Sequence, residues 1–147
     1  MLIQVKKKYR EEPIQRAMDI YFVLRDILLK KHKFDKEKEH FWVVILASNN
    51  RIKFIDEVSI GNLNQTIIKS REVFRFAILK GAASIIIAHN HPSGNLTPSE
   101  QDRKVMKSLS KAGEILGIKV LDSLIISERN YYSFLGESME EVDQRTT

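Results

Sequence analysis

The sequence predicts an α/β protein in which a mixed sheet is flanked by helices on both faces. Segments with helical periodicity alternate along the chain with short apolar runs of strand length. Two of these runs, at residues 41–46 and 83–88, are mostly or wholly apolar, which is typical of central strands buried on both faces. Because strands and helices alternate instead of being grouped separately, a layered sandwich is the predicted architecture.

Four elements are predicted in the first part of the chain. β-prone residues predict a short edge strand or arm at Leu2–Val5, and apolar residues at helical spacing predict a helix over Asp19–Lys31. A continuous apolar run predicts a central strand at Phe41–Leu46, and an extended run after the turn at residues 48–51 predicts the return strand of a hairpin at Ile52–Ile60. Asp19 is the predicted N-cap of the helix, and the charged residues 32–38 connect this helix to the central strand.

The second part is predicted to begin with an extended or irregular link over residues 63–68, after Gly61–Asn62 has ended the hairpin. The elements that follow are a helix at Arg71–Lys80 capped by Ser70 and Gly81, a strand at Ala83–Ala88, a helix from its Ser99 cap to Gly117, and strands at Lys119–Ile126 and Tyr131–Phe134. The residues of the longest helix predicted to face the core are Val105, Leu109, Ala112, Ile115 and Leu116.

Composition limits the organisation and the chemistry. A chain of 147 residues, 43% of them hydrophobic, fits one domain over residues 1–147, with an N-terminal arm at about 1–12 and a frayed polar tail at about 136–147. The chain has no cysteine, so His, Asp or Glu must hold any metal. No apolar run approaches the length of a membrane span, and no apolar segment of a signal peptide follows the lysine-rich start, so we expect a cytoplasmic protein.

The strongest functional signal lies at residues 89–102, which follow a predicted strand and enter a predicted helix. His89 and His91 are two residues apart on an extended segment, so their side chains project to the same face. Pro92 and Gly94 turn the chain, and Asp102 lies in the first turn of the next helix. Two imidazoles and one carboxylate can thus converge and leave a fourth tetrahedral position open, as in catalytic zinc sites.

The same residues carry a resemblance to a known family. His-x-His-Pro, six residues, Ser, two residues and Asp is the JAMM signature of the MPN/JAB metallopeptidase superfamily, and residues 89–102 match it without a gap. With its flanking blocks, the chain is similar to the bacterial RadC subfamily over about residues 39–134. The resemblance implies a cytidine-deaminase-like α/β/α sandwich and a zinc-dependent peptidase or isopeptidase of unknown substrate. RadC sequences typically carry Leu-Asp-His where this chain has Leu121-Asp122-Ser123.

The resemblance also assigns roles to two further residues. It implies that Glu39, directly before the first central strand, is the general base, and that Ser99 stabilises the oxyanion. Glu57, within the return strand, and Glu72, in a helical first turn where the dipole favours an acid, are the rival candidates for the base. His40 should point away from Glu39, and Asn90 away from the two histidines, because side chains alternate along a strand.

The motif and the charge distribution also allow functions that differ from hydrolysis. The histidines could be packed core residues, and Ser99 and Asp102 could form only a capping box. The net charge of +5 is concentrated in residues 1–98, since residues 99–147 are net negative. Such a surface is usually only solvated, but it could attract nucleic acid, in the DNA-repair-associated role traditionally attached to RadC. A third hypothesis is an MPN interaction module without turnover. Elemental analysis, the salt dependence of nucleic-acid binding, and the effect of changing Glu39 discriminate among the three.

Overall fold

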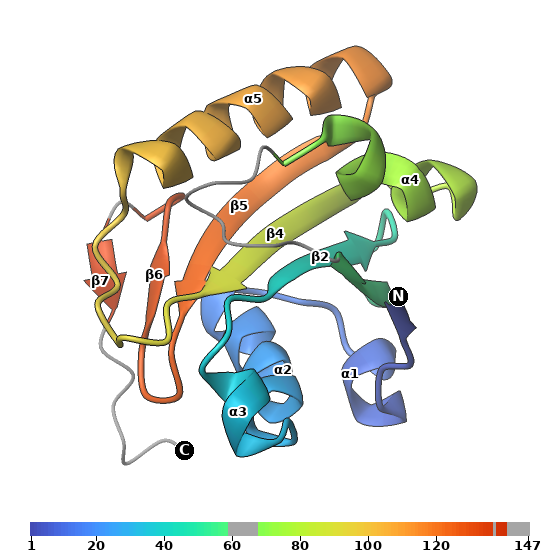
Figure 1. The fold of residues 1–147 in the computed structure, drawn as a ribbon. Coiled ribbons are helices and arrows are strands. Elements are labelled where there is room, and N and C mark those ends of the chain that lie inside the picture. Colours follow the sequence, from blue (N-terminus) through green and yellow to red (C-terminus); the bar gives the residue numbers. More distant parts are fainter. Residues whose placement is uncertain (59–67, 137, 141–147) are drawn as a thin grey trace.

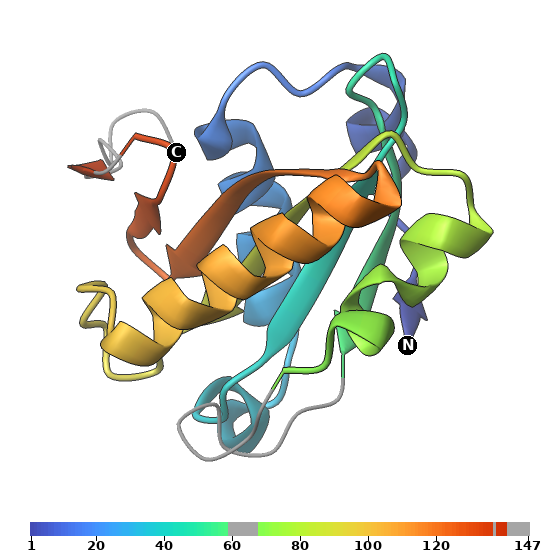
Figure 2. The same cartoon turned by 90° about the horizontal axis from the view of Figure 1, so that it is seen from above.

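A computed structural model of the chain describes residues 1–58, 68–136 and 138–140, and it places a sheet between two layers of helices (Figure 1). The elements are β1 (Leu2–Ile3), α1 (Lys7–Glu11), α2 (Ala17–Leu29), α3 (Lys33–Lys36), β2 (Phe41–Leu46), β3 (Ile52–Val58), α4 (Ser70–Leu79), β4 (Ser84–Asn90), α5 (Glu100–Leu116), β5 (Lys119–Ile126), β6 (Tyr131–Ser133) and β7 (Ser138–Glu140). Helices α4 and α5 cover one face of the sheet, and α1, α2 and α3 lie on the other (Figures 1 and 2). The predicted α/β/α architecture is confirmed.

Within the described residues the sheet has seven strands in the order β1-β3-β2-β4-β5-β6-β7. Strands β4 and β5 are parallel, whereas every other neighbouring pair is antiparallel, so the sheet is mixed as predicted. Helix α5 connects the parallel pair, as a parallel connection requires. This connection returns the chain over one face of the sheet and brings the start of α5 beside the end of β4 (Figure 1).

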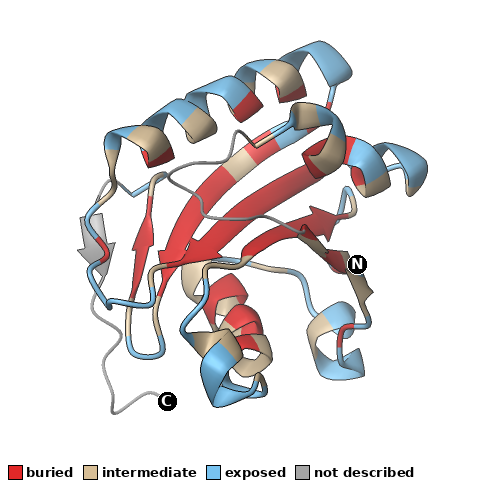
Figure 3. Ribbon diagram, in the orientation of Figure 1, coloured by how far each residue is buried: buried red, intermediate tan, exposed pale blue. Residues whose placement is uncertain are grey.

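The sheet separates two hydrophobic cores, and the central strands contribute to both. In β2, Trp42, Val44 and Leu46 pack against the residues of α2, while Phe41, Val43 and Ile45 pack beneath α4 and α5. Every residue of β2 and β4 is buried, as Figure 3 shows for the two central strands. Among the described helices, none combines the length and the apolar character needed to cross a membrane.

Two predicted N-caps are wrong by one to three positions. Helix α2 begins at Ala17, and Asp19 lies in its first turn, where the carboxylate Oδ2 accepts hydrogen bonds from the backbone amides of Gln15 and Arg16 at 3.0 and 3.1 Å. Helix α4 begins at Ser70 itself, with Lys69 at the N-cap position. An acid in the first turn and an acid at the N-cap both satisfy free amides, so the sequence pattern does not separate them.

The prediction for the core face of α5 is wrong at its C-terminal end. Leu109 is buried, but Ile115 is 87% exposed and Leu116 is 45% exposed. Gly113 explains the difference, because a Cβ atom at this position would lie 2.4 Å from the carbonyl oxygen of Ile118. The helix therefore approaches the sheet closely along the side that carries Leu109 and Gly113, and Ile115, half a turn away, projects into solvent. Gly117 ends α5 in the left-handed conformation, as predicted.

The remaining differences lie at the connections. The charged connector contains the short helix α3, and the last predicted strand ends one residue early, at Ser133. The segment predicted to be a frayed polar tail contains β7, which pairs with β6. The predicted end of the hairpin at residues 59–62, residues 63–67 of the link, and residues 141–147 of the tail lie outside the described residues.

Candidate metal centre

Strand β4 presents the two histidines on the face of the sheet that α5 covers. His89 is paired directly with Phe41, whose side chain belongs to the core beneath α4 and α5, and the two rings are stacked with centroids 6.5 Å apart. His91 follows two residues later, just beyond the strand, and its backbone amide still donates to the carbonyl of Ile126 at 3.0 Å. The ring centroids of the two histidines are 4.9 Å apart. The predicted same-side arrangement is therefore present.

The first turn of α5 supplies the carboxylate. Ser99 is the N-cap, and its Oγ accepts from the backbone amide of Asp102 at 3.0 Å, while Asp102 Oδ2 accepts from the amide of Ser99 at 2.8 Å. This reciprocal capping box fixes the backbone and the rotamer of Asp102. The capping role predicted for Ser99 is confirmed. The second carboxylate oxygen, Oδ1, takes no part in the cap and faces His89 Nε2.

The three side chains converge on one point. His89 Nε2 lies 3.1 Å from His91 Nε2 and 3.0 Å from Asp102 Oδ1, and His91 Nε2 lies 3.4 Å from Asp102 Oδ2. Two ligand atoms of a tetrahedral zinc ion are about 3.3 Å apart when each bond is about 2.0 Å long. The separations therefore fit a shared cation, and in the described part of the chain these residues form the one group of acidic and histidine side chains that could hold a metal ion.

The tautomer of His91 is set by a backbone carbonyl. Its Nδ1 lies 2.6 Å from the carbonyl oxygen of Asn95, which can only accept, so Nδ1 carries the proton. In the neutral ring this leaves the lone pair of Nε2 facing His89 and Asp102. Metal-binding histidines usually have such a partner on the nitrogen that does not bind the metal.

Asp102 carries the negative charge that a cation requires, whereas His91 must lose its proton before its Nε2 can bind one. Burial alone would raise the pKa of Asp102, but hydrogen bonds with His89 and His91 outweigh it and hold the pKa of this carboxyl well below its usual range. Burial opposes a charge on His91, yet its contacts with Asp102 and the Asn95 carbonyl, together with the charge of Glu39, raise the pKa of the ring. The side chain of Asp102 is only 2% exposed, and a buried, ionised carboxylate of this kind requires a positive partner.

Glu39 and Ser99, the two predicted catalytic residues, adjoin this group. Glu39 precedes Phe41 by two residues, which places it on the side of β2 that faces His89, and its charge contributes to the raised pKa of His91. Ser99 is half-buried, and its oxygen accepts from the Asp102 amide, so its hydroxyl proton can still be donated to a ligand. Their catalytic roles stay predictions.

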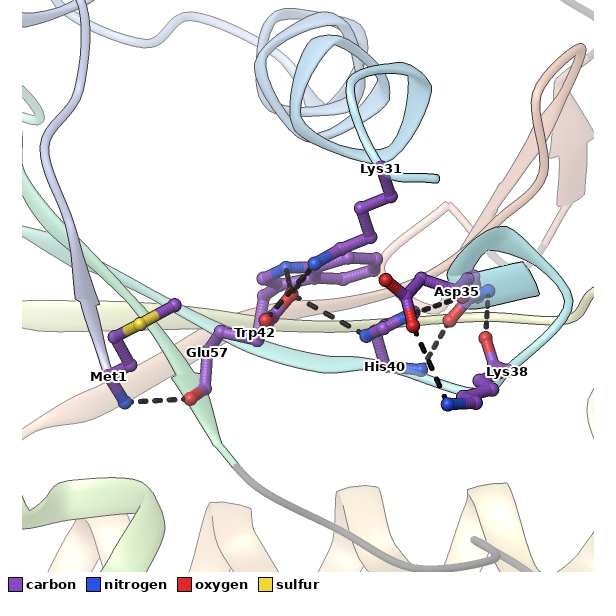
Figure 4. Close-up of polar contacts among 8 residues, drawn as sticks. Met1, Lys31, Asp35, Lys38, His40, Trp42 and Glu57 are labelled. Atoms are coloured by element: carbon purple, nitrogen blue, oxygen red, sulfur yellow. Dashed lines mark hydrogen bonds and ion pairs between the residues drawn. The ribbon is translucent and has the colours of Figure 1, made fainter. Parts of the chain in front are cut away.

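The rival base Glu57 lies on the opposite face of the sheet. Its carboxylate accepts from Trp42 Nε1 at 2.8 Å and forms an ion pair with Lys31 at 2.9 Å, on the side that α2 covers (Figure 4). His40, the residue directly before β2, joins this group, with its Nδ1 3.6 Å from Glu57 Oε1. His40 therefore points away from the metal centre, as predicted. Glu72 lies in the first turn of α4, in agreement with its explanation by the helix dipole.

Sequence reasoning missed a cleft next to His91. It has a volume of about 510 Å³ and is bounded by α3, the loop at residues 92–94 and the turn at residues 127–130. The sequence indicates a connector and two turns at these positions, and no local pattern shows that they meet.

Asp122, which belongs to the segment where this chain departs from the RadC pattern, is buried. Its carboxylate accepts hydrogen bonds from Ser133 Oγ and the Leu135 amide, and these bonds tie β5 to the chain after β6. The serine at position 123 is likewise buried.

Comparisons with known proteins agree with this geometry. Residues 15–140 match the family described as the RadC-like JAB domain. A UPF0758 protein of Caldanaerobacter subterraneus subsp. tengcongensis is 52% identical over 105 residues, which are 66% of this chain and 45% of that protein. A UPF0758 protein of Flavobacterium johnsoniae is 40% identical over 133 residues, 85% of this chain and 58% of that protein. The chain spans about half the length of the curated relatives it matches.

Proposed function

This chain belongs to the RadC-like JAB domain family, and from that membership we propose that it is a zinc-dependent metallohydrolase that cleaves peptide or isopeptide bonds. The observation that carries the proposal is the convergence of His89, His91 and Asp102, whose ligand atoms are 3.0–3.4 Å apart. Two nitrogens and one oxygen also leave a coordination position for water or substrate.

The chemistry divides among the metal and two side chains. When bound, zinc lowers the pKa of a coordinated water to about 7 and polarises a carbonyl group. Glu39 accepts a proton from the attacking water as the C–O bond forms and the carbonyl electron pair moves onto its oxygen. When that pair returns to restore the carbonyl, the C–N bond breaks and Glu39 gives the proton to the leaving nitrogen. The hydroxyl of Ser99 donates a hydrogen bond to the carbonyl oxygen as negative charge develops there.

Zinc content and chelation test the proposal together. We expect purified protein to hold about one zinc ion per chain and to cleave amide bonds in a mixed pool of peptides and lysine-linked isopeptides, with new termini detected by mass spectrometry. A chelator should abolish cleavage, and added zinc should restore it. Iron(II) also uses two histidines and one carboxylate, so elemental analysis that finds iron would contradict the zinc assignment, and protein that refuses every divalent metal would end the proposal.

A second candidate function, nucleic-acid binding, is favoured by one specific observation. Lys6 and Lys30 line the same pocket together with Asp26. The neighbouring Lys6, and more weakly Lys8, lower the pKa of Lys30, while Asp26 acts in the opposite direction, so cations from two segments share one surface. We propose that a phosphate backbone is the partner of this surface. Neutralising three phosphates of a single strand gives a slope of log K against log salt of about −2.

A labelled single-stranded DNA oligomer provides the measurement. The change Lys6→Glu should weaken binding and flatten the salt slope, whereas Lys107→Glu, on the exposed side of α5, should change either far less. Binding that is absent at low salt, or that does not depend on salt, would remove this second candidate.

A further inference from the structure

The side chain of Asn90 makes two hydrogen bonds to the segment that carries Glu39. Asn90 is 1% exposed and stands between the two histidines, with its side chain on the opposite face of β4. Its Oδ1 accepts from the backbone amide of His40 at 2.5 Å, and its Nδ2 donates to the carbonyl of Lys38 at 2.9 Å. The amide thus holds the residues immediately before and after Glu39. Only an amide offers a donor and an acceptor with this geometry.

The ring of His40 makes a second set of contacts for the same segment, on the same face of the sheet. Its Nε2 is 2.6 Å from the carbonyl oxygen of Asp35, and its Nδ1 faces Glu57, which Lys31 and Trp42 also contact (Figure 4). The ring is stacked on Trp42, with centroids 5.7 Å apart. Glu57 therefore has a structural role, because it closes a network that fixes where the backbone at Glu39 enters β2.

We propose that Asn90 is a positioning residue for Glu39, and that the His40 ring supports the same segment from the same face of the sheet. The inference rests on the proposed function, since it concerns the placement of the proposed base. The two metal-binding histidines and the amide that positions the base occupy three consecutive residues at the end of β4. Any shift of this strand end therefore moves the two histidines and Glu39 together, which preserves the placement of Glu39 relative to the histidines.

The change Asn90→Ala tests the proposal, with Asn49→Ala as the matched control, because Asn49 is an exposed asparagine at the other end of β2. Asn90→Ala should leave zinc content unchanged and lower hydrolysis of the peptide pool by about 10- to 100-fold, since a displacement of about 1 Å has effects of this size. A readout that needs no substrate is the visible spectrum of protein loaded with cobalt(II), followed over about pH 6 to 9. Asn90→Ala should shift its pH dependence in the same direction as Glu39→Gln does.

Double substitution separates positioning from a general structural effect. If Asn90 acts through Glu39, the double variant Glu39→Gln/Asn90→Ala should match Glu39→Gln alone in both readouts. Effects that add, or a loss of cobalt binding in Asn90→Ala, would overturn the proposal, because Asn90 would then act on the histidines. If Asn90→Ala does not fold, His40→Phe keeps the stacking on Trp42 and removes the ring nitrogens. It should shift the spectrum in the same direction, and an unchanged spectrum would overturn the inference.

Failure of the inference and failure of the proposed function give different results. If the protein holds no zinc and cleaves no amide bond, the proposed function fails. If it cleaves the pool but Glu39→Gln changes neither hydrolysis nor the cobalt spectrum, the base lies elsewhere, and the positioning role of Asn90 is wrong while the function stands. If Glu39→Gln changes both but Asn90→Ala behaves like Asn49→Ala, the function stands and the positioning role is wrong.

Discussion

Replacement of Asp102 by Asn should weaken zinc binding by more than about 100-fold, because losing even an outer partner of a metal ligand can lower affinity by about 10- to 100-fold. The substituted amide can still accept from the backbone amide of Ser99, so the cap of α5 and the fold should persist. What is lost is the negative charge that faces His89 and His91 from a side chain that is 2% exposed. Competition with a chromogenic zinc chelator measures the affinity.

The matched control is Glu100→Gln, which removes an exposed carboxylate from the same helical turn. It should leave zinc affinity unchanged, and circular dichroism should report the same helix content for both variants. If Asp102→Asn binds zinc as tightly as the unchanged protein, the carboxylate is not a ligand and zinc is held without it.

Replacement of Glu39 by Gln should lower hydrolysis by about 100- to 10,000-fold, which is the usual contribution of a positioned general base. The glutamine side chain keeps the shape of the glutamate but cannot take a proton from water. Because Glu39 is not one of the three grouped ligands, zinc content should stay the same. The rate is measured on the same peptide and isopeptide pool, with zinc quantified in each sample.

Glu37→Gln is the control for this change, since Glu37 is an exposed acid two residues earlier that borders the cleft beside His91. The rate of hydrolysis of the peptide and isopeptide pool should change less in Glu37→Gln than in Glu39→Gln. Unchanged hydrolysis in Glu39→Gln would place the base elsewhere. Zinc binding without hydrolysis in the unchanged protein would favour an MPN interaction module that holds a metal and performs no turnover.

Patterns within short stretches predicted much of the fold and the ligand group. The apolar run at Phe41–Leu46 and the bounds of β5 are as expected, since a strand buried on both faces must be apolar throughout. The spacing of His89 and His91 follows from strand geometry, and the position of Asp102 follows from the capping box that Ser99 opens. Each of these signals is complete within a few consecutive residues.

By itself the sequence determined the α/β class and which three side chains can share a cation, because strand alternation and helix capping are local properties of the chain. Only the tertiary structure decided that Glu57 faces α2 while Glu39 adjoins the metal centre, and that Asn90 holds Lys38 and His40 across about 50 residues of sequence. It also turned Ile115 outward through the close approach at Gly113. These outcomes depend on which strands pair and how near a helix lies to the sheet, and such contacts leave no pattern in neighbouring residues.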